Sequence, residues 1–465
     1  MLPGAGDHAS TSSKPHRDLI KGLNKMLNRA RGALGGRAGV ECRTIPFEQH
    51  GINRAAISNN ALKVIERLSA GGFNAYIVGG GVRDLLLGHE PKDFDVATDA
   101  LPEEVKHLFR NCRLIGRRFR LAHVHFGRDI VEVATFRANS GNGTGERRLE
   151  EGRLVRDNVY GGIEDDALRR DFTINALYYD PRANQVLDFT GGFDDLKSGL
   201  LRLIGDPKRR FREDPVRMLR AARFCAKLGF RLEPQIEKLI PEIGDLLGDI
   251  SPARLYDEIL KLFLTGHALS SFEQLRHLRI FEHLFPDTDA SLQGEDEGYP
   301  RTLISRAMAN TDRRVEQGKP VIPAFLFAAL LWDPVRLRAE ELVEDGAGER
   351  EALEQAAEWL MARQVKHTAI PKRASWPMRE IWFLQPRFNK RQGKGVLRLL
   401  GHPRFRAAYD FLLLRAETDD SLRELAQWWT EIQHKPEGAQ RQDALGGKKK
   451  KRRRRRGKRK PEGSG

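Results

Sequence analysis

The sequence predicts an α+β protein in which a small head with a mixed sheet is followed by an all-α remainder, with disordered basic tails at the ends. Short strand-like and helix-like segments alternate between residues 55 and 201. After Leu201 the strand signals fade, and helical periodicity continues to about residue 434. The segment from Lys448 to Lys460 contains 12 Lys or Arg in 13 residues, which is typical of a flexible tail.

The elements of the head follow from apolar spacing and from the positions of glycine and proline. The predicted helices cover residues 61–68, 82–87 and 102–109, and the predicted strands cover residues 74–78, 94–98, 121–126 and 130–136. Residues 140–152 are polar and rich in glycine, so we expect a loop there. The helical remainder has breaks near Pro286, Pro300, Pro371 and Pro403.

Composition limits the class of protein. The chain has 465 residues and a net charge of +16, nearly all of it in the two ends. A tail with this charge indicates an arm that neutralises phosphates, although a tail that only aids solubility remains an alternative.

The three cysteines are far apart, which disfavours disulfides and zinc and favours a cytoplasmic protein. No apolar run is long enough to span a bilayer. An amphipathic stretch from Leu19 to Leu34 suits a membrane surface, RNA or packing on the body.

The densest chemical signal lies between Tyr76 and Asp99. A predicted strand runs into Gly79, Gly80 and Gly81, and a predicted helix with Arg83 and Asp84 follows. Glycines at such a turn let the backbone approach a triphosphate, with helix amides directed at it. The turn is not a P-loop, because no Gly-Lys-Ser/Thr follows.

Two carboxylates follow this turn. Asp93 and Asp95 are two residues apart on a predicted strand, so both face one side. Glu132 lies on a later predicted strand and joins them if the two strands are neighbours. Three carboxylates close together repel one another unless cations hold them, and Mg²⁺ is the usual hard cation beside phosphates. An Asp pair in a solvated loop is the alternative. The preceding turn and the later carboxylate favour two metal ions.

These motifs together resemble the nucleotidyltransferase family shared by bacterial poly(A) polymerases and CCA-adding enzymes. The resemblance covers about residues 76–258 and includes Arg169-Arg170-Asp171 with Asn175, a hinge-like segment at residues 188–202, and the segment 213–217. It implies two Mg²⁺ on Asp93, Asp95 and Glu132, with Asp171 completing the catalytic set. The residues that it implies for nucleotide binding are Gly79, Gly80, Gly81, Arg83, Asp84, Arg170, Asn175, Asp214 and Arg217. We expect Asp171 and Asn175 to share one helix face.

The segment 213–217 resembles the family's base-reading motif. Asp214 and Arg217 are three residues apart, and on a helix they would project together. A carboxylate accepts from the adenine 6-amino group and a guanidinium donates to N1, whereas guanine presents the reverse pattern. Cytosine offers the same pattern as adenine, so this pair alone does not separate poly(A) addition from CCA addition. A surface ion pair on a helix is the structural alternative.

Other segments favour poly(A) addition. The string from Leu114 to Val124 resembles a stretch characteristic of the poly(A) polymerase branch. The stretch from Leu384 to Glu417 resembles that branch's C-terminal region, where exposed arginines and aromatic rings would hold bases, although Tyr409 to Leu414 reads better as core. The residues expected to bind RNA are Arg117, Arg118, Arg120, Arg387, Lys390, Arg391 and Lys394.

We therefore predict a template-independent polynucleotide adenylyltransferase that uses ATP as substrate and RNA 3′ ends as acceptors. The alternatives are a CCA-adding enzyme on the same scaffold and a catalytically inactive RNA-binding adaptor. We expect a cytoplasmic monomer that RNA-decay or RNA-chaperone proteins can contact. The expected domains are a flexible region (1–54), a catalytic head (55–185), a helical neck that reads the base (186–250), a helical body that binds RNA (251–434) and a disordered basic tail (435–465).

Overall fold

The computed structural model describes residues 41–116, 120–138, 147–150, 153–157, 159–293 and 303–445. The expected N-terminal amphipathic stretch, Arg117, Arg118 and the basic tail from residue 446 lie outside these ranges. The chain divides into two compact units. Unit 1 comprises the chain up to Arg170 together with Asn175–Gly192, and unit 2 comprises Asp171–Ile174 together with the chain from Phe193.

Unit 1 is built on an eight-stranded sheet with the strand order β1-β10-β9-β2-β3-β6-β5-β4. Its strands are β1 (Arg43–Pro46), β2 (Ala75–Val78), β3 (Asp95–Thr98), β4 (Cys112–Ile115), β5 (Leu121–Phe126), β6 (Asp129–Thr135), β9 (Leu177–Asp180) and β10 (Gln185–Asp188). All neighbouring pairs in this sheet are antiparallel except β3 and β6, which run parallel. A separate hairpin is formed by β7 (Arg147–Glu150) and β8 (Arg153–Asp157).

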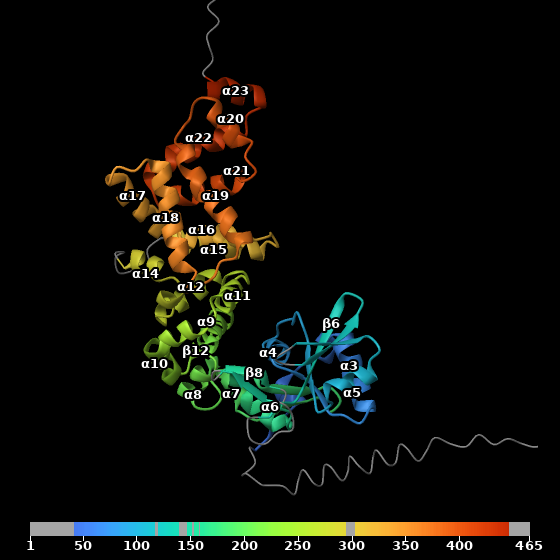
Figure 1. The fold of residues 1–465 in the computed structure, drawn as a ribbon. Coiled ribbons are helices and arrows are strands. Elements are labelled where there is room, and N and C mark those ends of the chain that lie inside the picture. Colours follow the sequence, from blue (N-terminus) through green and yellow to red (C-terminus); the bar gives the residue numbers. More distant parts are fainter. Residues whose placement is uncertain are drawn as a thin grey trace, which may run out of the picture. The chain divides into compact units, whose positions relative to one another are not determined.

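Two helices cover the middle of this sheet. The helices of unit 1 are α2 (Phe47–His50), α3 (Asn59–Ala70), α4 (Gly80–Leu86), α5 (Pro102–Leu108) and α6 (Ile163–Arg169), with a 3₁₀ turn η1 (Arg54–Ala56). Helix α3 packs on β2, β3 and β6, helix α5 packs on β4, β5 and β6, and the two helices contact each other (Figure 1). Helix α3 turns a stripe of fully buried side chains toward the strands, with Val64, Ile65 and Leu68 at helical spacing. Burial of this stripe fixes α3 beside the central strands.

The sequence predicted the central elements of the head but underestimated its sheet. The predicted helices and strands correspond to α3, α4, α5, β2, β3, β5 and β6. Strands β1, β4, β9 and β10 were not predicted. Two boundaries were wrong. Strand β1 lies inside the region expected to be flexible and pairs with β10, and β7 lies entirely inside the expected loop at 140–152.

Unit 2 is almost entirely helical, as predicted. Its described elements are η2 (Thr173–Asn175, whose last residue belongs to unit 1), α7 (Gly192–Ser198, whose first residue belongs to unit 1), β11 (Leu200–Leu201), α8 (Pro207–Glu213), α9 (Val216–Leu228), β12 (Arg231–Leu232), α10 (Pro234–Ile243), η3 (Gly244–Asp249), α11 (Pro252–Phe263), α12 (Ala268–His277), α13 (Phe281–Leu284), α14 (Pro286–Leu292), α15 (Leu303–Glu316), α16 (Pro323–Leu330), α17 (Trp332–Glu344), α18 (Glu349–Gln364), α19 (Lys372–Phe388), α20 (Lys394–Leu400), α21 (Phe405–Ala416), η4 (Asp420–Leu422), α22 (Arg423–Gln433) and α23 (Glu437–Leu445). Helix α23 lies inside the tail expected to be disordered from residue 435, so that boundary was wrong as well.

Buried tryptophans hold the last helices of unit 2 together. The indole of Trp382 donates to the carbonyl of Ala328 at 3.0 Å, and that of Trp429 donates to the carbonyl of Phe388 at 2.8 Å. Each bond satisfies the polar atom of a ring that is otherwise fully buried. No helix of the described ranges combines the length and the apolar character that crossing a membrane requires.

Candidate active site

A glycine turn joins β2 to α4 in unit 1. Gly79 caps α4 with φ 69° and ψ −133°, a left-handed conformation that side chains other than glycine rarely adopt. A Cβ at Gly79 would stand 3.3 Å from Nη1 of Arg170. Gly81 lies close to the segment that follows α4, because a Cβ there would stand 3.5 Å from the carbonyl oxygen of Asp93. The turn therefore needs glycine at its first position and lies directly beside the carboxylate segment.

Arg83 supports this turn from inside the unit. Its side chain is nearly fully buried, with its Nε donating to Oδ1 of Asp84 at 2.8 Å and its Nη1 donating to Oδ1 of Asn175 at 2.8 Å. A guanidinium committed to these acceptors is not open to a triphosphate. The expectation of direct contact by Arg83 is therefore wrong for this arrangement, and Arg83 instead positions the turn and Asn175.

Arg170 is held on the other side of the turn by a buried network. Its Nη2 donates to Oδ2 of Asp166 at 2.9 Å, its Nε donates to the hydroxyl of Tyr178 at 3.0 Å, and that hydroxyl donates to Asp166 at 2.7 Å. Burial alone would raise the pKa of Asp166, but Arg170 and Tyr178 outweigh it and hold that pKa below its usual range. Burial raises the pKa of Tyr178, so its hydroxyl stays protonated. The guanidinium is fixed beside Gly79.

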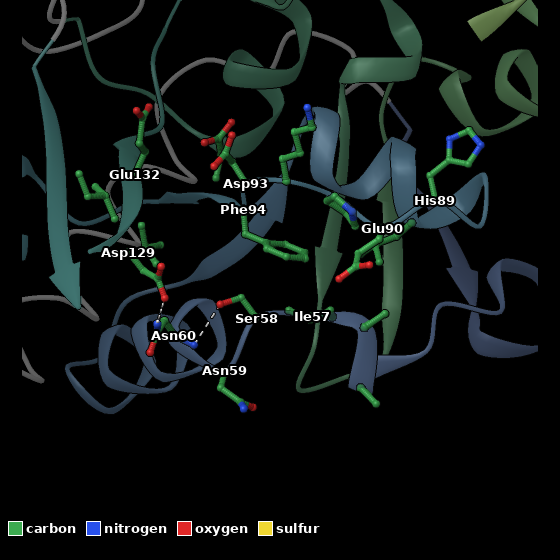
Figure 2. A pocket seen from close by; sticks show the side chains of 18 of the residues that line it. Ile57, Ser58, Asn59, Asn60, His89, Glu90, Asp93, Phe94, Asp129 and Glu132 are labelled. Atoms are coloured by element: carbon green, nitrogen blue, oxygen red, sulfur yellow. Dashed lines mark hydrogen bonds between the residues drawn. The ribbon is translucent and has the colours of Figure 1, made fainter. Parts of the chain in front are cut away.

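The three expected metal-binding carboxylates converge on one edge of the head sheet. Asp95 opens β3 and is the direct partner of Glu132 in the parallel register of β3 and β6, so the two side chains leave the same face. Asp93 precedes β3 by two residues in the chain. In Figure 2 the carboxylates of Asp93 and Glu132 lie on the same side of the site. The sequence prediction that Glu132 neighbours the Asp pair is confirmed by this register.

The pKa of Asp95 reflects this convergence of charges. Displacement of water by the surrounding protein, together with the charges of Glu132 and Asp93, raises its pKa to about 6 against the opposing effect of Arg170. Its side chain is nevertheless exposed to the cleft, so the carboxylate remains accessible from solvent. Three mutually repelling acids at an accessible edge form an electron-rich site that favours cations.

The carboxylates are neighbours without being closed around an ion. Within the described ranges, no group of three acidic, His or Cys side chains stands close enough to hold a metal as it is arranged. Oε1 of Glu132 instead lies 3.4 Å from Nε2 of His123, its partner in the antiparallel register with β5. The Glu132 side chain is about half exposed and has room to turn toward Asp95. Sequence reasoning did not identify this contact between His123 and Glu132.

A large cleft borders the carboxylates. It has a volume of about 1170 Å³ and is lined by the start of α3 with η1, by the segment between α4 and β3, and by the turn between β5 and β6. Figure 2 shows one end of it, where Nδ2 of Asn60 donates to Oδ2 of Asp129 at 3.1 Å. Asp93, Asp95 and Glu132 all line this cleft.

Asp171 and Asn175 do not share a helix, contrary to expectation. Helix α6 ends at Arg169, and Asn175 closes a separate 3₁₀ turn. In unit 1, Asn175 accepts from Arg83. In unit 2, Asp171 accepts from Nε of Arg220 at 2.7 Å. The helix stops at Arg169 because the next residue, Arg170, has an extended backbone with ψ 168°.

Asp214 and Arg217 also occupy different elements from those predicted. Asp214 caps the end of α8 with an extended backbone, and Arg217 lies in the first turn of α9, so they do not share one continuous helix. Asp214 pairs with Nη2 of Arg254 at 3.0 Å, whereas Arg217 donates to the carbonyl of Arg210 at 2.5 Å. Sequence reasoning did not find Arg254, because it is 40 residues away from Asp214 and no local spacing indicates the pair.

The expected RNA-binding residues are cations at the surface. Arg120 pairs with Glu103, and Arg391 pairs with Glu424 at 2.7 Å. The exposed members in the described ranges are Arg120, Arg387, Lys390, Arg391 and Lys394. The aromatic rings between the C-terminal cations are not exposed: Phe388, Phe405, Tyr409 and Phe411 all belong to the core. The core interpretation of Tyr409–Leu414 is confirmed, and the stacking interpretation is wrong for Phe388 and Phe405.

Comparisons with known proteins agree with this arrangement. The family described as "Poly A polymerase head domain" matches residues 75–202, "Probable RNA and SrmB- binding site of polymerase A" matches 229–292, and "Polymerase A arginine-rich C-terminus" matches 345–461. Poly(A) polymerase I of Salmonella typhi is 49% identical over 84% of this chain and 85% of its own length. That of Haemophilus influenzae is 48% identical over 86% and 90%.

CCA-adding enzymes match less of the chain. The CCA-adding enzyme of Lactobacillus helveticus is 40% identical, but the match covers only 46% of this chain and 52% of its own length. Among solved structures, the Bacillus stearothermophilus CCA-adding enzyme in complex with CTP has a TM-score of 0.52 at 25% identity, over 80% of this chain and 82% of that chain. The fold is thus shared with CCA-adding enzymes, while the length and identity of the curated matches show that the chain belongs to the poly(A) polymerase family.

Proposed function

We propose that this chain extends RNA 3′ ends with AMP from ATP, without a template and with release of pyrophosphate. Poly(A) polymerases that match most of its length carry this activity in their name. The single structural observation that supports it best is the register of Asp95 with Glu132, with Asp93 two residues before Asp95. Such a constellation is what transfer of a nucleotidyl group requires of a protein.

Asp93, Asp95 and Glu132 would hold two Mg²⁺ ions. They fit this role because displacement of water and the charges of Glu132 and Asp93 already raise the pKa of Asp95 to about 6, and a divalent cation would offset both effects. When bound, the ions would supply activation of the attacking hydroxyl and stabilisation of the charge on the leaving pyrophosphate. The half-exposed side chain of Glu132 would turn from His123 toward Asp95 to complete the set.

The protein groups around the carboxylates would orient the substrates. The amides of the glycine turn at Gly79, Gly80 and Gly81 would face the triphosphate. Arg170 would add a fixed positive charge, since Asp166 and Tyr178 hold it beside Gly79. A charge that is already oriented needs no reorganisation during the reaction, and this is the main way a protein accelerates phosphoryl transfer.

Base selection would fall to Asp214 and Arg217. Although they lie on two elements, each is held by a partner: Asp214 by Arg254 and Arg217 by the carbonyl of Arg210. Asp171, fixed by Arg220, would position the ribose or the priming end. The exposed cations Arg387, Lys390, Arg391 and Lys394 would contact RNA phosphates.

The test is an extension assay on a generic RNA primer with Mg²⁺. We expect a long ladder with ATP alone, and no requirement for CTP. A stop after three nucleotides that depends on CTP would indicate CCA addition, and the absence of any incorporation would indicate an inactive adaptor. A monomeric state, a cytoplasmic location and contacts with RNA-decay or RNA-chaperone proteins stay predictions from the sequence.

A further inference from the structure

The cleft beside the carboxylates is larger than one substrate group requires. Its volume of about 1170 Å³ exceeds the roughly 300–1,000 Å³ of typical small-molecule sites. All three carboxylates line the cleft, but Gly79, Gly80 and Gly81 do not. In the proposed function these glycines face the triphosphate. The carboxylates are thus reached from the glycine turn and, separately, from the cleft.

The reaction requires two such approaches. In phosphoryl transfer, the attacking oxygen and the leaving oxygen stand roughly in line on opposite sides of the phosphorus. If pyrophosphate leaves along the glycine turn, the attacking 3′-hydroxyl arrives from the side away from it. The cleft supplies that access in unit 1.

Two cations in the cleft are available for phosphates. Lys92 lies immediately before Asp93, and Arg128 lies in the turn between β5 and β6 that ends three residues before Glu132. Both are exposed, and neither makes an ion pair or a side-chain hydrogen bond within the described ranges. By contrast, Arg83 and Arg170 are committed to buried acceptors. Of these four cations, Lys92 and Arg128 are the two that remain open, and both line the cleft.

The remaining lining suits a nucleotide rather than an apolar ligand. Asn53, Ser58 and Asn59 supply amide and hydroxyl groups that bind sugar and base edges. The half-buried ring of Phe94 lies between the carboxylate side of the cleft and Ile57 (Figure 2) and offers a face on which a base can stack.

We infer that this cleft seats the 3′-terminal nucleotides of the RNA acceptor, with Lys92 and Arg128 contacting their phosphates. The inference rests on the proposed function, since it assigns the second substrate of the same reaction. It adds a seat for RNA within unit 1 itself, distinct from the basic helices of unit 2.

The test compares Lys92→Gln and Arg128→Gln with Arg113→Gln in the full chain. Arg113 is an exposed arginine on β4 of the same sheet that does not line the cleft, so it controls for general loss of charge. We expect each cleft variant to raise KM for the RNA about fivefold to tenfold, as for loss of one charged phosphate contact. KM for ATP and kcat at saturating RNA stay within about twofold. The slope of log KM for RNA against log salt decreases by about 0.7 for each variant.

Three outcomes overturn the inference. The first is a rise in KM for ATP instead of RNA, which would place the triphosphate in the cleft. The others are a loss of kcat with both KM values unchanged, and an equal effect of Arg113→Gln. Failure of the proposed function is a separate result, because it appears as no AMP incorporation by the unaltered chain.

A second measurement does not depend on catalysis. A primer that ends in 4-thiouridine is irradiated with the full chain in the absence of ATP, and the cross-linked peptides are mapped. We expect adducts within residues 51–60, 88–94 or 128–132, the segments that line the cleft. Adducts confined to other peptides overturn the inference.

Discussion

The two units place their functional residues on different kinds of structure. In unit 1 the carboxylates sit on neighbouring strands, where the hydrogen-bond register of β3 with β6 fixes Asp95 against Glu132. In unit 2 the expected base-reading residues sit at a break between two helices, and side-chain partners fix them. A register holds groups rigidly, whereas a helix end held by ion pairs tolerates small shifts. We therefore expect changes to the carboxylates to abolish AMP incorporation, and changes at the helix break to alter the preference for ATP by degrees.

Removing a register-held carboxylate should have the largest effect. Asp95→Asn removes the charge at the centre of the carboxylate set while keeping its shape. We expect AMP incorporation to fall at least about a thousandfold, since the charge of the metal site is central to the transfer. The assay is primer extension at saturating ATP and Mg²⁺, with circular dichroism as a check on folding.

Glu164→Gln is the matched control, since Glu164 is an exposed acid of the same unit outside the cleft. We expect its activity to equal that of the unaltered chain. Substantial tail synthesis by Asp95→Asn would contradict the assignment of the metal site.

Changes to Asp214 and Arg217, at the break between α8 and α9, should alter the choice of nucleotide more than the rate of incorporation. Asp214→Ala removes the acceptor expected to face the adenine 6-amino group. We expect the preference for ATP over GTP, measured as the ratio of kcat/KM values, to fall about 10- to 100-fold.

Arg254→Ala provides a graded comparison. It leaves Asp214 in place but removes the guanidinium 3.0 Å from it, so we expect a smaller loss of preference in the same direction. An unchanged preference in both variants would show that these residues do not read the base.

A comparison of Gly79 with Gly72 distinguishes the effect of backbone strain from an effect on ATP binding in unit 1. Gly79→Ala and Gly72→Ala each place a side chain at a positive φ, and each should destabilise the fold by about 1 kcal/mol. Only Gly79→Ala also brings a methyl group to 3.3 Å from Arg170, because nothing lies within 4 Å at Gly72. We expect similar shifts in Tm and a rise of about tenfold in KM for ATP in Gly79→Ala alone. Equal KM values in both variants would separate the glycine turn from ATP.

The smallest expected effect is a pH dependence of stability in the metal-free chain. Because the pKa of Asp95 is raised to about 6, the folded state binds this proton more tightly than the unfolded state. The resulting stabilisation is fully present below about pH 4 and is lost as pH rises through about 6. Thermal unfolding in EDTA should show this trend, and Asp95→Asn should remove it. A trend that persists in the variant would assign the titration to another group.

The sequence predicted that Glu132 lies beside the Asp pair because the signals for these elements are local. Asp93 and Asp95 are two residues apart, and Glu132 lies in a strand-like apolar segment that follows a Gly127-Arg128-Asp129 turn. The break at Asp214 also had a local signal, since Pro215 disfavours helical backbone at the residue before it. The network of Asp166 and Tyr178 around Arg170 depends on where β9 lies in the sheet, and the pairing of Arg254 with Asp214 depends on how α11 folds back. Contacts of that kind follow from packing, which local patterns do not encode.

The one parallel pairing among the described strands of the head sheet, β3 with β6, has a consequence for how the protein can vary. Parallel neighbours need a crossover, and here it runs through α5, β4 and β5. The pairing of β3 with β6 anchors both ends of that excursion, so we predict that substitutions along it, including at Arg120, leave Asp95 and Glu132 aligned. The sequence of this short stretch of chain can therefore change without moving the two carboxylates apart.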